Sequence, residues 1–557
     1  MNSGNTTPDY PCNNNTTQYM TKEKRLLLGD EAIALGALNA GIQGVYAYPG
    51  TPSTEITEFI QLHPLTKERG IHSAWCTNEK TAMEAALGVS YVGKRALVCM
   101  KHVGMNVAAD AFVNSAMAGP NGGVVVVAAD DPSMHSSQNE QDSRFYGKFS
   151  LVPVLEPSNQ QEAYDMVKYA FELSEQKRVP VLLRVTTRMA HSRAVVEVDT
   201  QAEPIAPLHY PAEPKSWILL PANSRKRYPE LIATYNNLQN ECKWNKFYNT
   251  PLSDGTFSQQ GIIACGIAFN YLCENMPEEE FVGKPIYKVS QYPVEESVIR
   301  KMAEECSEIL IMEEGQPLLE EMVKGILPTP CKISGRLNGV LPREGELTPD
   351  SVRKSLGLAP HEAHAASQNV VPRPPALCMG CGHRDVYNAL NETLKEYPNH
   401  KVFSDIGCYT LGALPPFRAI DSTIDMGASI TMAKGAADAG QFPAVAVIGD
   451  STFTHSGITG LLDAANANAN MVVIISDNLT TGMTGGQDSA GTTKLEAICM
   501  AVGVDPKHVR GVVPLAKNME EIKQIIKEEI EYNGLSVIIP RRECIQTFKR
   551  HQKAKKQ

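Results

Sequence analysis

One stretch of the sequence, residues 444–487, constrains the fold more than any other. It begins with an apolar run, turns at Gly449 and Asp450, and continues through a segment rich in Ala and Leu. A second apolar run, residues 471–476, leads into a turn that contains Asn478. This order predicts a strand, a helix and a second strand, with both turns at the carboxyl edge of one parallel sheet. We therefore expect Asp450 and Asn478 to lie close together.

The same two turns offer oxygen ligands for Mg²⁺. Asp450 has a carboxylate, Asn478 an amide oxygen and Thr480 a backbone carbonyl, and Mg²⁺ needs about six oxygens at roughly 2.1 Å, which a diphosphate and water can complete. Gly449 allows close approach of the backbone to phosphates, and the start of the next helix adds donors from Ser451 and Thr452. The expected ligand is a diphosphate held through Mg²⁺. An Asp in such a turn is common, so a purely structural role stays open.

Length, charge and cysteine usage limit the class of protein. A chain of 557 residues suggests three or four domains at about 150 residues each. A net charge of −10 argues against nucleic acid as the main partner. No apolar run reaches the roughly 18 residues that indicate a membrane span. The 13 cysteines are odd in number and scattered through apolar runs, which favours buried thiols in a reducing cytoplasm over a disulfide framework.

Changes in composition divide the chain into domains and linkers. The polar start is rich in Asn and Thr and lacks the apolar centre of a signal peptide, so we expect disorder over residues 1–23. A helix is expected at about Tyr228 to Gln239, within a connector rich in Pro and charge. The predicted domains are 24–197, 255–341 and 375–557, separated by linkers 198–254 and 342–374.

Three features of the first domain could be structural or functional. Thr51 lies in a turn that opens a helix, where hydroxyls cap the helix or help to bind a carboxylate. Glu79 begins an Ala-rich helix, a position at which the helix dipole commonly favours a surface carboxylate. The polar, His-containing run 130–144 follows an apolar strand at 124–129 and is either a solvated loop or the rim of an active site.

Several motifs, in one order from about Lys24 to Thr547, resemble a known family. They are YPGTPSTE, NEKTAMEAALG, MKHVGMNVAAD, ADDPSMHSSQNEQDSR, CMGCGHR, SDIGCYTLG, DMGASI and GD followed by DNLTTGMTGGQ. Together they are similar to the α subunits of indolepyruvate:ferredoxin oxidoreductases, which depend on thiamine diphosphate (ThDP). The ending TGGQ distinguishes this family from ThDP decarboxylases and transketolases.

The resemblance implies a fold and a reaction. The fold is multi-domain α/β, in which ThDP-binding domains have parallel sheets flanked by helices and the middle domain resembles the C-terminal domain of transketolase. The reaction is the CoA-dependent oxidative decarboxylation of aryl 2-oxoacids to acyl-CoA and CO₂, with ferredoxin as electron acceptor. A smaller β subunit completes the enzyme, which is cytoplasmic and has neither nucleic acid nor membrane as a partner.

The resemblance also implies roles for individual residues. Glu79 would bond N1′ of the aminopyrimidine of ThDP and activate it by sharing a proton. Thr51 would hold the substrate carboxylate, and Lys101 and His102 are weaker candidates for the substrate pocket. His383 would touch ThDP, although a satisfied buried histidine is the alternative. The other cofactor contacts are Gly427, Gly449, Asp450, Ser451, Thr452, Asn478 and Thr480.

Four cysteines stand in contexts that suggest a metal centre. Cys378 and Cys381 form a CxxC motif with a nearby histidine, which alone could be half of a zinc site. In related oxidoreductases, cysteines in these contexts and in those of Cys408 and Cys544 hold a [4Fe-4S] cluster. Reduced structural thiols are the third alternative. Without a cluster the protein would be an aryl pyruvate decarboxylase that releases an aldehyde, and without catalysis it would be a ThDP-binding scaffold.

The chain departs from the family pattern in one respect and agrees with the indolepyruvate branch in another. Relatives carry a ferredoxin-like tail with two further cysteine groups, whereas no cysteine follows Cys544 here. We therefore expect the onward electron route to use another subunit or a soluble carrier. Pyruvate-type relatives have Asn where this chain has Met483, which suggests a more apolar substrate pocket here.

Overall fold

The computed structural model describes residues 22–327, 331–362, 365–371 and 373–554. The expected disordered extension therefore lies outside the described residues, except for its last two. For these the expectation is wrong, because Lys22 and Glu23 begin strand β1 (Lys22–Leu28), which pairs antiparallel with β8 (Arg193–Asp199). Most of β1 is exposed, so it lacks the apolar alternation by which a strand is predicted.

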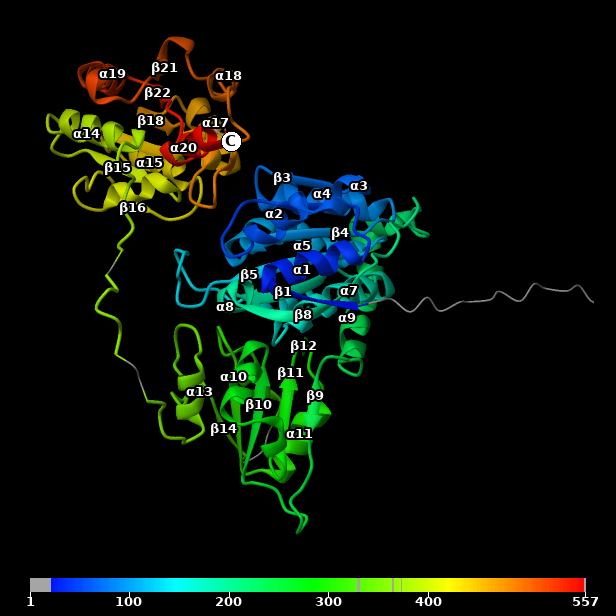
Figure 1. The fold of residues 1–557 in the computed structure, drawn as a ribbon. Helices are drawn as coiled ribbons and strands as arrows, with labels where there is room; N and C mark the ends of the chain where they lie inside the picture. The colour runs from blue at the N-terminus through cyan, green and yellow to red at the C-terminus, as the bar shows by residue number, and fades with distance from the viewer. Residues whose placement is uncertain (1–21, 328–330, 363–364, 372, 555–557) are drawn as a thin grey trace, which may run out of the picture.

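The N-terminal domain is built on a seven-stranded sheet in the order β12-β6-β7-β5-β4-β2-β3 (Figure 1). All neighbours are parallel except β12, which is antiparallel to β6. The strands are β2 (Gly44–Ala47), β3 (His72–Trp75), β4 (Ala96–Lys101), β5 (Val124–Asp130), β6 (Val154–Leu155), β7 (Val181–Thr186) and β12 (Gln291–Tyr292).

Helices cover both faces of this sheet. Residues of α1 (Gly29–Asn39), α2 (Thr54–Leu62) and α7 (Gln160–Lys177) pack with Leu97 and Cys99 of β4. Residues of α4 (Glu79–Tyr91) and α5 (His102–Ala118) pack with Val98 and Met100 on the opposite face. Burial on both faces explains why the strands are nearly continuous apolar runs. The shorter helices are α3 (Pro64–Glu68), α6 (Arg144–Ser150) and α8 (Thr187–His191).

The middle domain has a five-stranded sheet in the order β14-β13-β10-β11-β9. Its strands are β9 (Lys246–Tyr248), β10 (Gln260–Cys265), β11 (Ile286–Val289), β13 (Glu308–Met312) and β14 (Lys332–Ser334), and its helices α10 (Ile267–Asn275), α11 (Glu296–Glu305) and α12 (Leu318–Ile326). The central strands and helices agree with the predicted α/β unit. The edge strand β9 comes from the stretch that we interpreted as a linker.

The two stretches that we interpreted as linkers also contain helices. The expected helix at about Tyr228 to Gln239 begins seven residues earlier, as α9 (Pro221–Leu238), with Pro221 in its first turn and Pro229 inside. Proline suits the first turn of a helix, where Pro221 lies, whereas Pro229 inside the helix removes a backbone hydrogen-bond donor. The second stretch contains α13 (Pro349–Ser355), whose Pro349 carbonyl accepts a hydrogen bond of 2.9 Å from Asn275 of α10.

The C-terminal domain has a six-stranded parallel sheet in the order β16-β15-β17-β18-β22-β21. The strands are β15 (Lys401–Ser404), β16 (Ser422–Thr423), β17 (Ala444–Gly449), β18 (Met471–Ser476), β21 (Val509–Val512) and β22 (Leu535–Pro540). Helices α14 (Gly382–Leu394) and α19 (Met519–Glu531) pack on one face, and α15 (Ala428–Asp438), α17 (Ile458–Asn466) and α18 (Leu495–Ala501) on the other. The predicted strand pair is confirmed, because β17 and β18 are parallel neighbours.

The N- and C-terminal domains meet at the carboxyl edges of their sheets. In Figure 1 the C-terminal domain, in yellow to red, lies against the blue N-terminal domain near α2, α4 and β3. Across this contact Asn78 Nδ2 donates to the carbonyl of His455 at 3.0 Å. Gln487 Nε2 donates to Glu58 Oε1 of α2 at 2.8 Å. The edges at which parallel sheets bind ligands therefore face each other.

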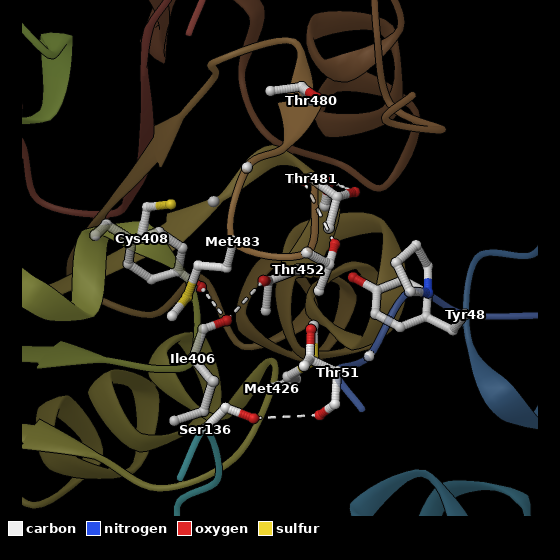
Figure 2. A pocket seen from close by; sticks show the side chains of 18 of the residues that line it. Tyr48, Thr51, Ser136, Ile406, Cys408, Met426, Thr452, Thr480, Thr481 and Met483 are labelled. Atoms are coloured by element: carbon white, nitrogen blue, oxygen red, sulfur yellow. Dashed lines mark hydrogen bonds between the residues drawn. The ribbon is translucent and has the colours of Figure 1, made fainter. Parts of the chain in front are cut away.

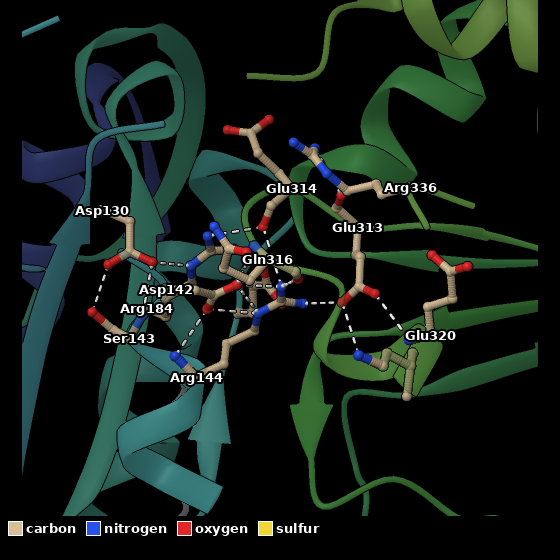
Figure 3. Close-up of polar contacts among 12 residues, drawn as sticks. Asp130, Asp142, Ser143, Arg144, Arg184, Glu313, Glu314, Gln316, Glu320 and Arg336 are labelled. Carbon is tan, nitrogen blue, oxygen red and sulfur yellow. Dashed lines mark hydrogen bonds and ion pairs between the residues drawn. The ribbon is translucent and has the colours of Figure 1, made fainter. Parts of the chain in front are cut away.

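A buried ion network joins the N-terminal domain to the middle domain (Figure 3). Arg144 lies 2.5 Å from Asp142 and 2.9 Å from Glu313, which follows β13 of the middle domain. Arg184 of β7 lies 2.7 Å from Asp130 and also pairs with Glu156. The ends of the polar run 130–144 are thus structural, since its carboxylates neutralise two buried guanidinium groups.

Candidate functional site

Four turns at the carboxyl edge of the C-terminal sheet gather residues that are far apart in sequence. Cys408 follows β15, Asp450 follows β17, Asn478 follows β18 and Cys544 follows β22. These four strands are adjacent and parallel, so their carboxyl ends lie side by side. The topology therefore brings the predicted Mg²⁺ ligands and two of the predicted cluster ligands to one place.

A cavity with about 890 Å³ of space, its mouth included, lies between this edge and the N-terminal domain (Figure 2). The N-terminal domain contributes Tyr48, Thr51 and Lys101 to its wall, and Ser136 and Gln138 come from the polar run. The polar run 130–144 therefore also forms a rim of the site, which is one of the two roles that we expected for it. The predicted residues on the C-terminal side are Cys408, Gly449, Asp450, Ser451, Thr452, Asn478, Thr480 and Met483.

Asp450 has the properties of a metal ligand. It is only 2% exposed, and among the described residues its Oδ2 atom has no hydrogen-bond partner. Burial raises the pKa of Asp450 to about 7, with a further contribution from nearby Asp477. An ionised carboxylate at this position needs a compensating cation. Asp450 therefore fits Mg²⁺ better than a purely structural role.

The turn after β18 is shaped by its own hydrogen bonds. Asn478 Oδ1 accepts from the Thr480 backbone N at 3.1 Å, and Leu479 between them has a φ of 62°. The Thr480 hydroxyl donates to the Gln487 carbonyl at 2.8 Å. The Thr480 side chain is thus engaged elsewhere, which agrees with our expectation that its backbone carbonyl is the ligand.

Glu79 lies at the N-terminus of α4 and is buried, with 4% of its surface exposed. The common alternative, a surface carboxylate, is therefore wrong for this residue. It packs against Gly104 of α5, where an added Cβ would lie 2.7 Å from Glu79 Cγ. Glu79 Oε2 forms a hydrogen bond of 2.9 Å with His455 Nε2 of the C-terminal domain. The two domains thus share a buried carboxylate–imidazole pair.

His455 was not predicted from the sequence. It lies in a five-residue π-helical segment, Phe453–Gly457, between the GD turn and α17. Such segments insert an extra residue in the helix and change the direction of its side chains. The ring also contacts Tyr48 edge-on, with 4.7 Å between the ring centroids. The available signal was a histidine five residues after Asp450, but the π-helical segment that directs it cannot be recognised from the spacing of apolar residues.

The structure explains why two of the predicted cofactor contacts, Gly427 and Gly449, are glycines. Gly427 has a φ of 96°, and an added Cβ would lie 2.6 Å from Ser456, beside His455. At Gly449 an added Cβ would lie 2.5 Å from the ring of Tyr409. The contacts described at Gly449 are to the ring of Tyr409. The lack of a side chain at Gly449 therefore allows this ring to pack closely and also leaves room at the cavity wall.

The predicted substrate residues differ in how they are placed. The Thr51 carbonyl accepts from Ser136 Oγ at 3.3 Å, and Lys101 Nζ donates to the Ser136 carbonyl at 3.1 Å. Burial lowers the pKa of Lys101. His102 has both ring nitrogens engaged by the loop after β5, with Asp131 N at 3.2 Å and the Asn139 carbonyl at 3.2 Å. Thr51 and Lys101 thus reach the cavity, whereas His102 holds the rim.

Helix α2 does not use the turn before it as a side-chain cap. The helix begins at Thr54, and Ser53 at its N-cap makes no side-chain capping bond. Instead Ser53 Oγ donates to the Gly50 carbonyl at 2.8 Å. The capping interpretation of this turn is therefore wrong, and Thr51 is directed to the cavity wall.

A second cavity, of about 640 Å³, adjoins the first and is lined by Cys378, Cys381, Cys408 and Cys544. Cys408, Asn478 and Gly482 line both cavities, and the Cys544 backbone N donates to the Asn478 carbonyl at 3.0 Å. The four predicted cysteines therefore surround one space that shares a wall with the predicted cofactor site.

The spacing of these cysteines does not fit zinc. Four ligands about 2.3 Å from one zinc ion would lie within about 4 Å of one another. Among the described residues, only Asp30, Glu55 and His191 have three ligand atoms within 4.8 Å of one another. An iron–sulfur cubane binds each thiolate to a different iron, so its ligands stand further apart. The cavity therefore fits a cluster better than a single ion.

His383 lines the same cavity and is not a satisfied histidine. It is 5% exposed, and within the described part of the chain neither ring nitrogen has a hydrogen-bond partner. Burial lowers its pKa to about 4. A neutral, unpartnered imidazole is available to a bound group.

Comparisons with known proteins relate the chain to one enzyme family. The family described as pyruvate flavodoxin/ferredoxin oxidoreductase, thiamine diP-bdg, matches residues 35–241, and the C-terminal thiamine pyrophosphate-binding domain family matches residues 405–539. The chain is 38% identical to the indolepyruvate oxidoreductase subunit IorA of Archaeoglobus fulgidus, over 94% of this chain and 86% of the relative. It is likewise 38% identical to that of Pyrococcus horikoshii, with the same coverage. The solved 2-oxoglutarate:ferredoxin oxidoreductase of Magnetococcus marinus aligns with 56% of this chain and 62% of its own, at 16% identity and a TM-score of 0.47.

Proposed function

Because this chain belongs to the IorA family of indolepyruvate oxidoreductase subunits, we propose that it catalyses the oxidative decarboxylation of aryl 2-oxoacids with ThDP. The observation that carries the proposal is the cavity between the two domains. Asp450, with its unpartnered carboxylate oxygen, lines the cavity on the C-terminal side. Buried Glu79 is linked to the opposite wall through its partner His455, which contacts the wall residue Tyr48. A cofactor with a basic ring and a diphosphate requires this pair of groups.

The residues of the two domains would have different roles in cofactor binding. Asp450, Asn478 and the Thr480 carbonyl would hold Mg²⁺ and through it the diphosphate. Glu79 would hold a proton at Oε2, where it now bonds His455, and would share it with the ring nitrogen of the cofactor. His455 keeps this carboxylate oriented and offers a second place for the proton. Bound ThDP supplies a carbon nucleophile for the 2-oxo group.

The four-cysteine cavity supports a redox reaction. Cys378, Cys381, Cys408 and Cys544 would hold a [4Fe-4S] cluster, which accepts electrons one at a time. The wall that both cavities share places this acceptor next to the cofactor. CoA would then take the acyl group, a β subunit would complete the enzyme, and ferredoxin would receive the electrons. The thiols support a reducing, cytoplasmic location.

The lining of the cavity favours an aryl substrate. Ile406, Met426 and Met483 line it, and Met483 is 58% exposed and so available for contact. Apolar and thioether side chains favour flat aromatic groups through burial and S–aromatic contacts. Thr51 and Lys101 would meet the substrate carboxylate at the N-terminal side.

Product analysis tests the proposal. The chain is purified anaerobically with the β subunit and supplied with indolepyruvate, CoA, ThDP, Mg²⁺ and ferredoxin. We expect indoleacetyl-CoA, reduced ferredoxin, and about four irons per chain with absorbance that bleaches on reduction. Indoleacetaldehyde without bound iron would show a decarboxylase instead. No turnover with either product, despite bound ThDP, would leave the chain as a scaffold.

A further inference from the structure

A second polar cluster lies on the N-terminal domain and lines neither of the two cavities described above. Asp30 lies at the start of α1, Glu55 at the start of α2 and His191 at the end of α8. One ligand atom from each residue lies within 4.8 Å of the other two. Three separate helices therefore converge on one point with two carboxylates and an imidazole.

Asp30 lacks the partners that a buried carboxyl group requires. Its exposure is 0%, and within the described part of the chain neither carboxylate oxygen has a hydrogen-bond partner. A buried polar group without partners costs free energy, and a buried charge costs more. Burial raises the pKa of Asp30 well above its usual range, and Glu55 and Glu31 raise it further. The group is aimed at the cluster, where no residue that the structure describes satisfies it.

The spacing of the other two groups suits two ligands of one ion. Glu55 Oε2 and His191 Nε2 lie 3.6 Å apart, beyond an ordinary hydrogen bond. Two ligands of a tetrahedral ion, each at about 2.1 Å, lie roughly 3.4 Å from each other. Glu55 Oε2 is itself buried without a hydrogen-bond partner among the described residues. His191 is exposed, which provides a path for entry from solvent.

We propose that Asp30, Glu55 and His191 bind a divalent transition-metal ion, with Zn²⁺ as the best match. An imidazole with two carboxylates is a ligand set for such ions, whereas Mg²⁺ and Ca²⁺ prefer all-oxygen sites. The dication offsets the two negative charges, and water completes a tetrahedral shell. The ion would tie α1, α2 and α8 together and fix the start of α2, which follows the turn that carries Thr51.

Zinc binding to variants of the holoenzyme tests the proposal. The enzyme, loaded with ThDP and held in excess Mg²⁺, is titrated anaerobically with Zn²⁺ by calorimetry. We expect one zinc per chain in the wild type and at least a tenfold weaker affinity in Asp30→Asn and in His191→Ala. His361→Ala is the matched control, because that exposed histidine pairs with a single carboxylate, Asp350, at 2.9 Å, and it should bind zinc normally.

The outcomes separate this site from the cysteines. Zinc taken up by the thiols would be unaffected by Asp30→Asn or His191→Ala, so equal binding in the wild type and both variants would overturn the proposal. Anomalous scattering at the zinc edge from crystals of the same sample should place the ion between the three residues, and a peak elsewhere would also overturn it. Since His191 is exposed, His191→Ala should fold even where Asp30→Asn does not.

Discussion

Burial gives several side chains at this site roles that differ from the usual roles of their residue types. Asp450 was predicted from its place after a strand and Glu79 from the family resemblance, and the structure shows that both are buried. His455 could not be identified in this way, because its direction depends on a π-helical segment. Asp30 could not either, since an acidic residue in the first turn of a helix is normally exposed. What the sequence lacks is the surroundings of each group.

Replacing Asp450 tests the predicted metal end of the cavity. Asp450→Asn keeps an oxygen of similar shape but removes the charge, so ThDP binding at fixed Mg²⁺ should weaken at least tenfold. Without Mg²⁺ the variant should melt at a higher temperature than the wild type, because a buried, unpartnered carboxylate has been removed. Titration of ThDP by fluorescence quenching measures the first effect. Asp463→Asn, an exposed position on α17, is the control, and an unchanged ThDP affinity in Asp450→Asn would refute the assignment.

Strands, like single residues, include some that the sequence predicts and some that it does not. Strands β5, β17 and β18 are buried on both faces, and their apolar runs predicted them correctly. Strands β1 and β9 lie in polar stretches and exist because a partner strand pairs with them. Pairing between distant segments leaves no trace in local periodicity, so such edge strands are missed.

The packing of α5 against α4 gives a test of how Glu79 is positioned. Gly104→Ala places a Cβ within 2.7 Å of Glu79 Cγ and Oε1, which must displace the carboxylate. We expect turnover to fall at least tenfold while ThDP binding changes little, because the metal end is untouched. Gly88→Ala on α4 is the matched control, since nothing lies within 4 Å of its added Cβ. That variant should keep full activity and gain about 0.5–1 kcal/mol in stability. Equal turnover in both variants would refute the positioning role.

The N-terminal domain has two interfaces: the one with the C-terminal domain borders the proposed cofactor cavity, and the one with the middle domain contains a buried ion network. The family resemblance predicted the fold class, and the comparisons support it, whereas the predicted domain bounds stay a prediction. The ion network at the middle domain was not predicted, because the charges of Asp142, Arg144 and Glu313 are distributed over distant segments. Only the folded chain shows that they neutralise one another.

Removing one arginine from this network should destabilise the protein. Arg144→Ala leaves Asp142 and Glu313 buried without their partner and should cost about 3–5 kcal/mol. Scanning calorimetry should show a clearly lower Tm. Arg300→Ala, which breaks an exposed pair with Glu296 on α11, should cost less than about 1 kcal/mol. Similar losses in both variants would contradict the structural role of the network.

Glu314, next to this network, should make stability depend on pH. It is fully buried, and burial raises its pKa to about 7 although Arg184 opposes the shift. The unfolded chain ionises at lower pH than the folded one, so the contribution of Glu314 to stability is lost as pH rises towards 7. The Tm of Glu314→Gln minus that of the wild type should therefore grow between pH 5 and 7.5. Glu344→Gln, at an exposed position, should show no such trend, and a flat difference for Glu314→Gln would be inconsistent with this pKa.

The central proposal is that the N- and C-terminal domains together bind one cofactor. Exchange of the C2 proton of bound ThDP with deuterium tests this most directly. In Glu79→Gln, ThDP and Mg²⁺ should bind with nearly wild-type affinity, because Asp450, Asn478 and Thr480 are intact. The exchange rate, measured by NMR after acid quenching, should fall by at least about 100-fold, since the proton-sharing carboxylate is lost. An exchange rate equal to that of the wild type, with ThDP fully bound, would contradict the account.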